Sequence, residues 1–173
     1  MPRDALAVMG EEACSPFFVY GTLMAGFRNR DAVLTPHAMR TARATLVEAA
    51  RVWHWPARGY PALELCATPP ATAVEASPVR GELVWVHDGA RALACVDALE
   101  DCYGPADPRS EYDRVRVTAV ADGEALAVRA WTYVARTLQP RPGEPAPELV
   151  RGGCWRAHVA RAGLVDAPDA RFA

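Results

Sequence analysis

The chain has 173 residues, of which 51% are hydrophobic and 23% are charged. This composition is typical of one folded domain with a sizeable core and excludes a disordered chain. The formal net charge of −2 argues against the large basic surface that binds nucleic acid, so we expect no nucleic-acid partner. All 19 positively charged residues are arginine. Without lysine, the chain has no Schiff-base amine, no anchor for pyridoxal phosphate and no phosphate-binding loop of the usual type.

The cysteines and the N-terminal segment indicate where the protein resides. None of the five cysteines forms a Cys-x-x-Cys pair, so neither a disulfide framework nor a zinc ribbon is expected. Glu11 and Glu12 lie where a signal peptide needs an apolar core, and the longest uncharged run, 13–27, is too short and too interrupted to cross a membrane. The four histidines lack metal-ligand spacing. We therefore expect a cytoplasmic protein without membrane association, metal or cofactor.

The first predicted element is a short buried strand over residues 17–20, which ends at Gly21. Residues 1–10 before it are predicted to be a loose leader. A chain that leaves a strand through a glycine turn exposes successive backbone N–H groups, and these can hold a carboxylate or a developing oxyanion. Residues Tyr20 to Leu23 are therefore a candidate binding loop. Taken alone, the same four residues are better explained by an ordinary strand-to-loop turn.

The segment that follows contains weaker patterns. Residues 31–40 are predicted as a short helix that Pro36 begins or breaks. Residues 41–53 are rich in Val, Thr and Ala and are predicted as one strand, and 60–66 as another. Residues 68–78 are predicted as a loop because they are rich in Pro and Ala.

Residues 79–87 are predicted as a largely buried strand, and Asp88 as the cap of a helix that runs to about Asp101. At 100° per residue, Asp97 and Asp101 point toward solvent, whereas Glu100 lies at the edge of the apolar arc. A carboxylate that faces a core must be paired with a cation, hydrogen-bonded, or raised in pKa. The pattern leaves open whether Glu100 is a catalytic acid/base or the partner of one of the many arginines.

The last third of the chain predicts a hairpin and a final helix. Residues 112–120 alternate in polarity, 121–123 (Ala-Asp-Gly) form a turn signal, and 125–134 return as the partner strand. Residues 148–164 are predicted as a helix. Because hairpins and irregular loops join most strands, we expect an α+β fold on a largely antiparallel, barrel-like sheet. One domain is expected over residues 1–173, with its core at about 16–160 and loose tails.

Seven segments together resemble the gamma-glutamylcyclotransferase-like family. They are FFVYGTLMAGFRN (17–29), GYPAL (59–63), VRGELVWV (79–86), LACVDALEDCYG (93–104), YDRVRV (112–117), AWTYV (130–134) and GGCW (152–155), in the order seen in that family. Each segment is weak alone, but the Tyr-Gly-Thr-Leu start, the Asp-x-x-Glu and the following Tyr-x-Arg are specific as a set. The similarity extends over about 16–160.

The resemblance implies a small mixed, mostly antiparallel β-barrel with flanking helices and a cavity at one mouth. It implies that backbone groups of Tyr20, Gly21, Thr22 and Leu23 bind a glutamyl group, and that Glu100 is the catalytic acid/base. It further implies that two aromatic residues, Tyr112 and Tyr133, line the pocket.

The activity implied is cyclisation of a gamma-glutamyl amide to 5-oxoproline, with release of an amine or amino acid and without a cofactor. Asp101 stands where family members often have glycine, and the 102–110 segment is longer than in compact members; both departures put the substrate in doubt. The substrate, its metabolic role and the oligomeric state stay open. The alternative is a non-catalytic small-molecule-binding or interaction protein on the same scaffold.

Overall fold

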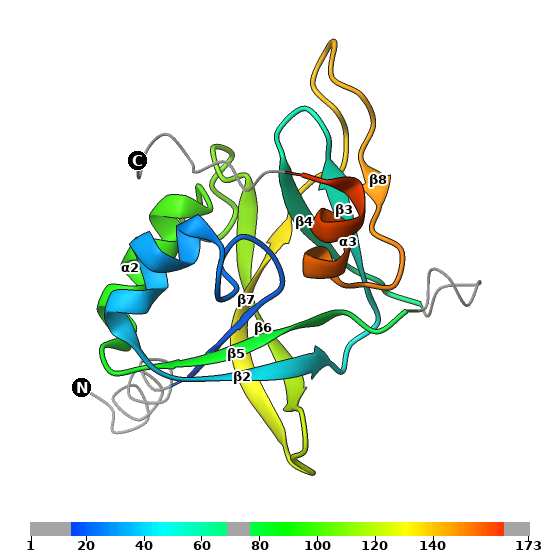
Figure 1. Cartoon of the computed structure of the whole chain (residues 1–173). Coiled ribbons are helices and arrows are strands. Elements are labelled where there is room, and N and C mark those ends of the chain that lie inside the picture. Colours follow the sequence, from blue (N-terminus) through cyan, green and yellow to red (C-terminus); the bar gives the residue numbers. More distant parts are fainter. Residues whose placement is uncertain (1–14, 69–76, 165–173) are drawn as a thin grey trace.

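The computed structural model describes residues 15–68 and 77–164 (Figure 1). Within these residues, eight strands form two sheets: β1 (Phe17–Val19), β2 (Ala38–Leu46), β3 (Ala50–Trp55), β4 (Tyr60–Leu65), β5 (Arg80–Val86), β6 (Tyr112–Ala121), β7 (Ala127–Ala135) and β8 (Glu148–Leu149). The helical elements are η1 (Arg30–Leu34), η2 (Thr35–His37), α2 (Gly89–Leu99) and α3 (Trp155–Ala162). The fold is therefore mixed α+β, as the sequence predicted.

Five strands close into a barrel in the order β1–β5–β2–β6–β7. Neighbouring strands are antiparallel except β1 and β7, which run parallel where Phe17 lies opposite Trp131. This single parallel contact closes the barrel and makes it mixed. Because the barrel is closed, each of these five strands has a neighbouring strand on both sides. This pairing protects the sheet from adding a strand of another molecule.

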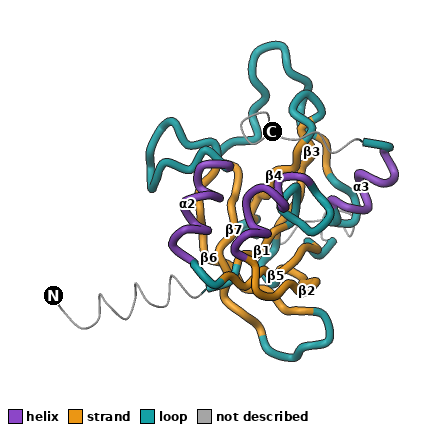
Figure 2. Tube along the Cα trace, turned by 60° about the vertical axis from the view of Figure 1, so that its left-hand side comes forward, coloured by secondary structure: helices purple, strands orange, loops and turns teal. Residues whose placement is uncertain are grey.

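A second sheet, in the order β4–β3–β8, lies beside the barrel. Figure 1 shows α3 next to this sheet, and α2 beside the helical turns at residues 28–37 on the opposite flank. Figure 2 shows the same arrangement after a 60° turn. One buried cluster joins both sheets, and its largest fully buried side chains include Trp55, Trp155, Phe17, Phe18, Leu34 and Leu63.

The helix predicted at 31–40 is wrong in its second half. The chain forms one π-helical turn, η1, and one 3₁₀ turn, η2, and then enters β2 at Ala38. Pro36 lies in the short 3₁₀ turn, where its missing N–H costs little, but it cannot continue a regular helix. The pairing of Ala38 with Val86 on β5 then extends the backbone as a strand.

The single strand predicted at 41–53 is two strands that belong to different sheets. β2 follows β6 up to Leu46, and the chain then leaves the barrel at residues 47–49 and enters β3 at Ala50. The carboxylate of Glu48 accepts the backbone N–H of Thr118 with both oxygens, at 2.8 and 3.0 Å. The side chain thus satisfies a donor of β6 that a continuing β2 would otherwise bond.

The helix predicted at 148–164 begins only at Trp155. Glu148–Leu149 pair with β3 as the short strand β8. Gly152 and Gly153 both have positive φ, and a Cβ at Gly153 would lie 2.4 Å from the carbonyl oxygen of Pro78. Only glycine fits there, so the chain turns sharply before α3 starts.

The remaining strand predictions, and the helix that follows Asp88, are confirmed to within one or two residues. The side chain of Asp88 accepts the N–H of Arg91 at 3.0 Å, as a cap does. The leader at 1–10, most of the loop at 68–78 and the C-terminal tail lie outside the described residues. Within the described part of the chain, no helix combines the length and apolar character needed to span a membrane.

Candidate active site

A cavity of about 340 Å³ opens at one end of the barrel, between the end of β1, the start of β4, the end of α2 and the β6–β7 pair. All seven residues that the sequence singled out line it: Tyr20, Gly21, Thr22, Leu23, Glu100, Tyr112 and Tyr133. They come from four segments that are up to 113 positions apart in the chain. The fold therefore brings the candidate loop and the candidate carboxylate into one hollow.

The loop after β1 makes a tight turn at the cavity wall. The N–H of Met24 donates to the carbonyl of Gly21 at 3.0 Å, so the peptide groups between them curve around the cavity. A Cβ at Gly21 would lie 2.4 Å from Cγ of Pro61, closer than side chains tolerate. Glycine is required here because β4 passes directly against the loop.

Glu82 on β5 accepts a hydrogen bond from the end of this loop, and sequence reasoning did not identify it. The N–H of Ala25 donates to Oε2 of Glu82 at 2.8 Å, and Arg156 on α3 donates to Oε1 at 3.1 Å and to the carbonyl of Ala25 at 2.7 Å. Arg30 is buried nearby, with Nη1 3.9 Å from the same carboxylate. Glu82 is itself buried, so these contacts compensate its desolvation and fix the loop backbone.

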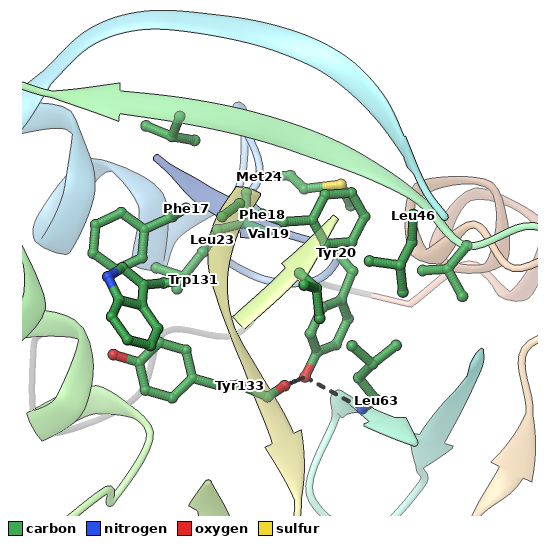
Figure 3. Close-up of a cluster of buried hydrophobic side chains, with 14 of the residues drawn as sticks. Phe17, Phe18, Val19, Tyr20, Leu23, Met24, Leu46, Leu63, Trp131 and Tyr133 are labelled. Atoms are coloured by element: carbon green, nitrogen blue, oxygen red, sulfur yellow. Dashed lines mark hydrogen bonds between the residues drawn. The ribbon is translucent and has the colours of Figure 1, made fainter. Parts of the chain in front are cut away.

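The hydroxyl of Tyr20 joins the barrel to the second sheet. It donates to the carbonyl of Tyr133 at 2.9 Å and accepts the N–H of Leu63 at 3.2 Å (Figure 3). Burial, followed by the nearby charge of Glu100, raises the pKa of Tyr20 well above its ordinary value. The side chain therefore stays neutral, and its hydroxyl serves the fold rather than a ligand.

The hydroxyls of the other two tyrosines are also engaged by the protein. Tyr112 donates to the carbonyl of Pro61 at 3.3 Å, and Tyr133 donates to Oδ1 of Asp97 at 2.6 Å. Burial is the main cause that raises the pKa of both phenols. Both side chains thus present mainly aromatic surface to the cavity.

Glu100 is not inside the helix, as the sequence predicted, but is its C-terminal cap. α2 ends at Leu99, and Glu100 has φ −86° and ψ 7°, with its N–H still bonded to the carbonyl of Val96. The side chain is half-buried, lines the cavity, and its charge contributes to the raised pKa of Tyr20, Tyr112 and Tyr133. The end of α2 therefore places a carboxylate close to the three tyrosine side chains.

The solvent-facing orientation predicted for Asp97 is wrong. Its carboxylate accepts from Tyr133 at 2.6 Å and from Arg114 at 2.5 Å, both on the barrel. Helical spacing places Asp97 away from the apolar arc, but the barrel wraps around that side of the helix as well. Asp97 thus ties the last turn of α2, and with it Glu100, to strands β6 and β7.

Asp101 was also predicted to face solvent, and it lines the cavity instead. Its φ of +48° lies in the left-handed region, so counting 100° per residue fails two positions beyond the helix end at Leu99. A left-handed residue after a helix is most often glycine. The departure from the family pattern noted in the sequence therefore falls at a position where the backbone favours glycine.

Arg58, Tyr60 and Glu111 also line the cavity and belong to a charged cluster that sequence reasoning missed. Nη1 of Arg58 donates to Oε1 of Glu111 at 2.6 Å, and Nη2 donates to Glu144 at 2.8 Å. The hydroxyl of Tyr60 donates to the same Oε1 of Glu111 at 2.9 Å. Burial and the charge of Glu111 raise the pKa of Tyr60 to about 12. The sequence could have indicated this cluster, because Tyr60 belongs to the family-like segment GYPAL and Glu111 directly precedes Tyr112, which begins another such segment.

Within residues 15–68 and 77–164, no group of three or more His, Cys, Asp or Glu side chains is arranged to hold a metal ion. The polar groups that line the cavity include carboxylates, the guanidinium group of Arg58, phenols, threonine hydroxyls, the carboxamide of Asn29 and main-chain amides. Such a set can bind a zwitterion of amino-acid size and transfer protons to or from it.

Comparisons with known proteins agree with this fold. The sequence model of the family described as gamma-glutamyl cyclotransferase, AIG2-like, matches residues 17–157. No curated protein sequence matches the chain. An AIG2-like protein from Mus musculus is 24% identical, with a TM-score of 0.60 over 91% of this chain and 98% of that chain. A protein from Arabidopsis thaliana is 21% identical, with a TM-score of 0.53 over 75% of this chain and 74% of that chain.

YkqA from Bacillus subtilis is 16% identical, with a TM-score of 0.55 over 87% of this chain and 42% of that chain. At these identities, the three solved structures show that the fold is shared and nothing beyond the fold.

Proposed function

Because the chain belongs to the AIG2-like gamma-glutamyl cyclotransferase family, we propose that it cyclises a gamma-glutamyl amide to 5-oxoproline and releases the amine or amino acid. The observation that carries the proposal is the position of Glu100 in the same 340 Å³ cavity as the turn Tyr20–Leu23. A volume of this size suits a glutamyl group and the first atoms of its amide substituent.

The reaction forms one bond and breaks one. The α-amine of the glutamyl group attacks its own δ-carbonyl carbon, a five-membered lactam closes, and the bond from that carbon to the amide nitrogen breaks. The α-ammonium loses one proton before attack and a second as the lactam forms. The departing nitrogen gains two protons and leaves as an ammonium ion. The reaction therefore needs proton transfer but no oxidant, reductant or cofactor.

We assign the proton transfers to Glu100. Its carboxylate would take a proton from the α-ammonium and return it to the departing nitrogen, a role worth about 10²–10⁴-fold in rate. Its attachment at the end of α2, which Asp97 ties to the barrel, supports the fixed position that this role requires. Aromatic walls around it exclude water and strengthen its electrostatic effect.

We assign substrate binding to the backbone of Tyr20, Gly21, Thr22 and Leu23 and to the rings of Tyr112 and Tyr133. The loop amides would bind the substrate carboxylate or stabilise the oxyanion at the δ-carbon. The rings would hold the glutamyl chain folded, and a well-oriented intramolecular attack can gain roughly 7–11 kcal/mol. The contacts of Glu82 with Ala25 and Arg156 support a loop that is ordered before the substrate arrives.

A direct test is incubation of the purified protein with a panel of gamma-glutamyl amines and gamma-glutamyl amino acids. Mass spectrometry follows 5-oxoproline and the released amine together. Formation of both products from any member of the panel supports the proposal. Saturable binding of a panel member without product supports the alternative, a binding or interaction protein on the same scaffold.

The cytoplasm, which offers such metabolites, remains the proposed location.

A further inference from the structure

A second cavity of about 430 Å³ adjoins the first. Four residues, Arg58, Asp101, Glu111 and Tyr112, line both cavities and form the boundary between them. Asp101 directly follows Glu100, so the boundary begins beside the carboxylate assigned to proton transfer. The two cavities therefore meet where the amide nitrogen of a substrate would lie.

More arginines than acids line the second cavity. The arginines are Arg58, Arg109, Arg136 and Arg141, and the acids are Asp101 and Glu111. Further acids that pair with these arginines do not line the cavity. They are Asp107, which pairs with Arg109, Asp113, which pairs with Arg136, and Glu144, which pairs with Arg58.

Two of the four arginines are placed to meet a ligand. The side chains of Arg109 and Arg141 are 70% and 66% exposed, whereas that of Arg58 is 11% exposed and lies between Glu111 and Glu144. Arg109 donates to Asp107 from Nε and Nη2, which leaves Nη1 for a ligand. Arg141 approaches Glu111 only at 3.6 Å, longer than a direct hydrogen bond. The guanidinium of Arg109 lies 4.7 Å from the ring centre of Tyr103, within the segment 102–110 that is longer than in compact family members.

We infer that the second cavity binds the leaving group and favours one that carries a carboxylate, with Arg109 and Arg141 as specificity-determining residues. The inference rests on the proposed function. Whatever is attached to the amide nitrogen must extend away from the loop that binds the glutamyl group, past Asp101, and into the second cavity. A guanidinium group binds a carboxylate through two parallel hydrogen bonds, whereas an ammonium there would be repelled.

Three substrates of nearly equal size test this preference. The three substrates differ in the group carried by the amine that they release. This group is a carboxylate in gamma-glutamylglycine, a neutral alkyl group in gamma-glutamylpropylamine, and an ammonium group in the mono-gamma-glutamyl amide of ethylenediamine. The wild-type protein should show the highest kcat/KM with gamma-glutamylglycine, by about tenfold or more over propylamine, as expected for one charged hydrogen-bonded contact. The ethylenediamine amide should be the poorest of the three.

The variants Arg109→Ala and Arg141→Ala should each lower the ratio of kcat/KM between gamma-glutamylglycine and gamma-glutamylpropylamine by about fivefold to tenfold. Because both substrates are measured on one sample, partial loss of folded protein cancels from the ratio. Arg129→Ala is the matched control, since Arg129 is also exposed but lies opposite Thr118, away from the cavity end of the β6–β7 pair. Its ratio should equal that of the wild type.

The failures of the two proposals are distinguishable. If none of the three amides gives 5-oxoproline and neither does any other gamma-glutamyl amide, the proposed function fails. If the amides react with equal kcat/KM, if the ammonium compound is preferred, or if the arginine variants leave the ratio unmoved, this inference fails and the proposed function stands.

Discussion

The hydroxyl of Tyr20 offers a quantitative test of how the cavity is built. In Tyr20→Phe, the carbonyl of Tyr133 loses its donor at 2.9 Å and the N–H of Leu63 loses its acceptor at 3.2 Å. Both partners belong to buried residues. Each buried polar group left without a partner costs about 1–3 kcal/mol. Allowing for relaxation, we expect the free energy of unfolding to fall by about 2–4 kcal/mol, and the Tm by roughly 5–15 °C.

The control is Tyr112→Phe, which removes one longer bond, 3.3 Å, to the carbonyl of Pro61. It should cost about 1 kcal/mol or less. Urea unfolding followed by circular dichroism measures both variants and the wild type under identical conditions. If Tyr20→Phe proved no less stable than Tyr112→Phe, the hydroxyl of Tyr20 would not join the two sheets, and its place in the cavity would need another explanation.

Three further predictions concern the backbone and the histidine pair His54 and His158. Asp101→Gly should raise the free energy of unfolding by about 0.5–1 kcal/mol because φ is +48°; an unchanged Tm would contradict this. Gly21→Ala should lower it by about 1–3 kcal/mol, since the new Cβ meets the rigid ring of Pro61; an unchanged urea midpoint would count against the close contact. Burial lowers the pKa of His54 and His158, and Nδ1 of His54 lies 3.1 Å from Nε2 of His158. Stability present above the unfolded-state pKa of about 6.5 should therefore be lost as pH falls through the folded-state values, and His158→Gln should show a smaller loss of urea midpoint between pH 7.5 and 5.5.

The sequence predicted the barrel because its central strands carry their own signals. Residues 79–87 contain a largely apolar run, residues 112–120 alternate in polarity, and the turn at 121–123 ends with a glycine of positive φ. The boundaries that failed depend on distant contacts. Glu48 ends β2 by bonding Thr118, seventy positions away, and no local pattern at 47–49 reveals that partner.

The candidate site was predictable where the motif is local and unpredictable where it depends on packing. Glu100 and the loop from Tyr20 to Leu23 belong to short segments with a recognisable order, and the fold places both at one cavity. Glu82 and Asp97 were missed because their partners come from other strands and from α3. Helical spacing predicts which side chains share a face of one helix. Whether a side chain near the end of that helix is buried depends on the strands and loops that pack against it.

The central claim, that Glu100 transfers the protons, is tested most directly by the kcat of Glu100→Gln. Glutamine keeps the size of the side chain and removes its ability to accept a proton at neutral pH. With the best substrate of the panel and a Tm within a few degrees of the wild type, we predict that kcat falls by about 10²–10⁴-fold. A folded Glu100→Gln protein that forms 5-oxoproline within a few-fold of the wild-type rate would contradict the account.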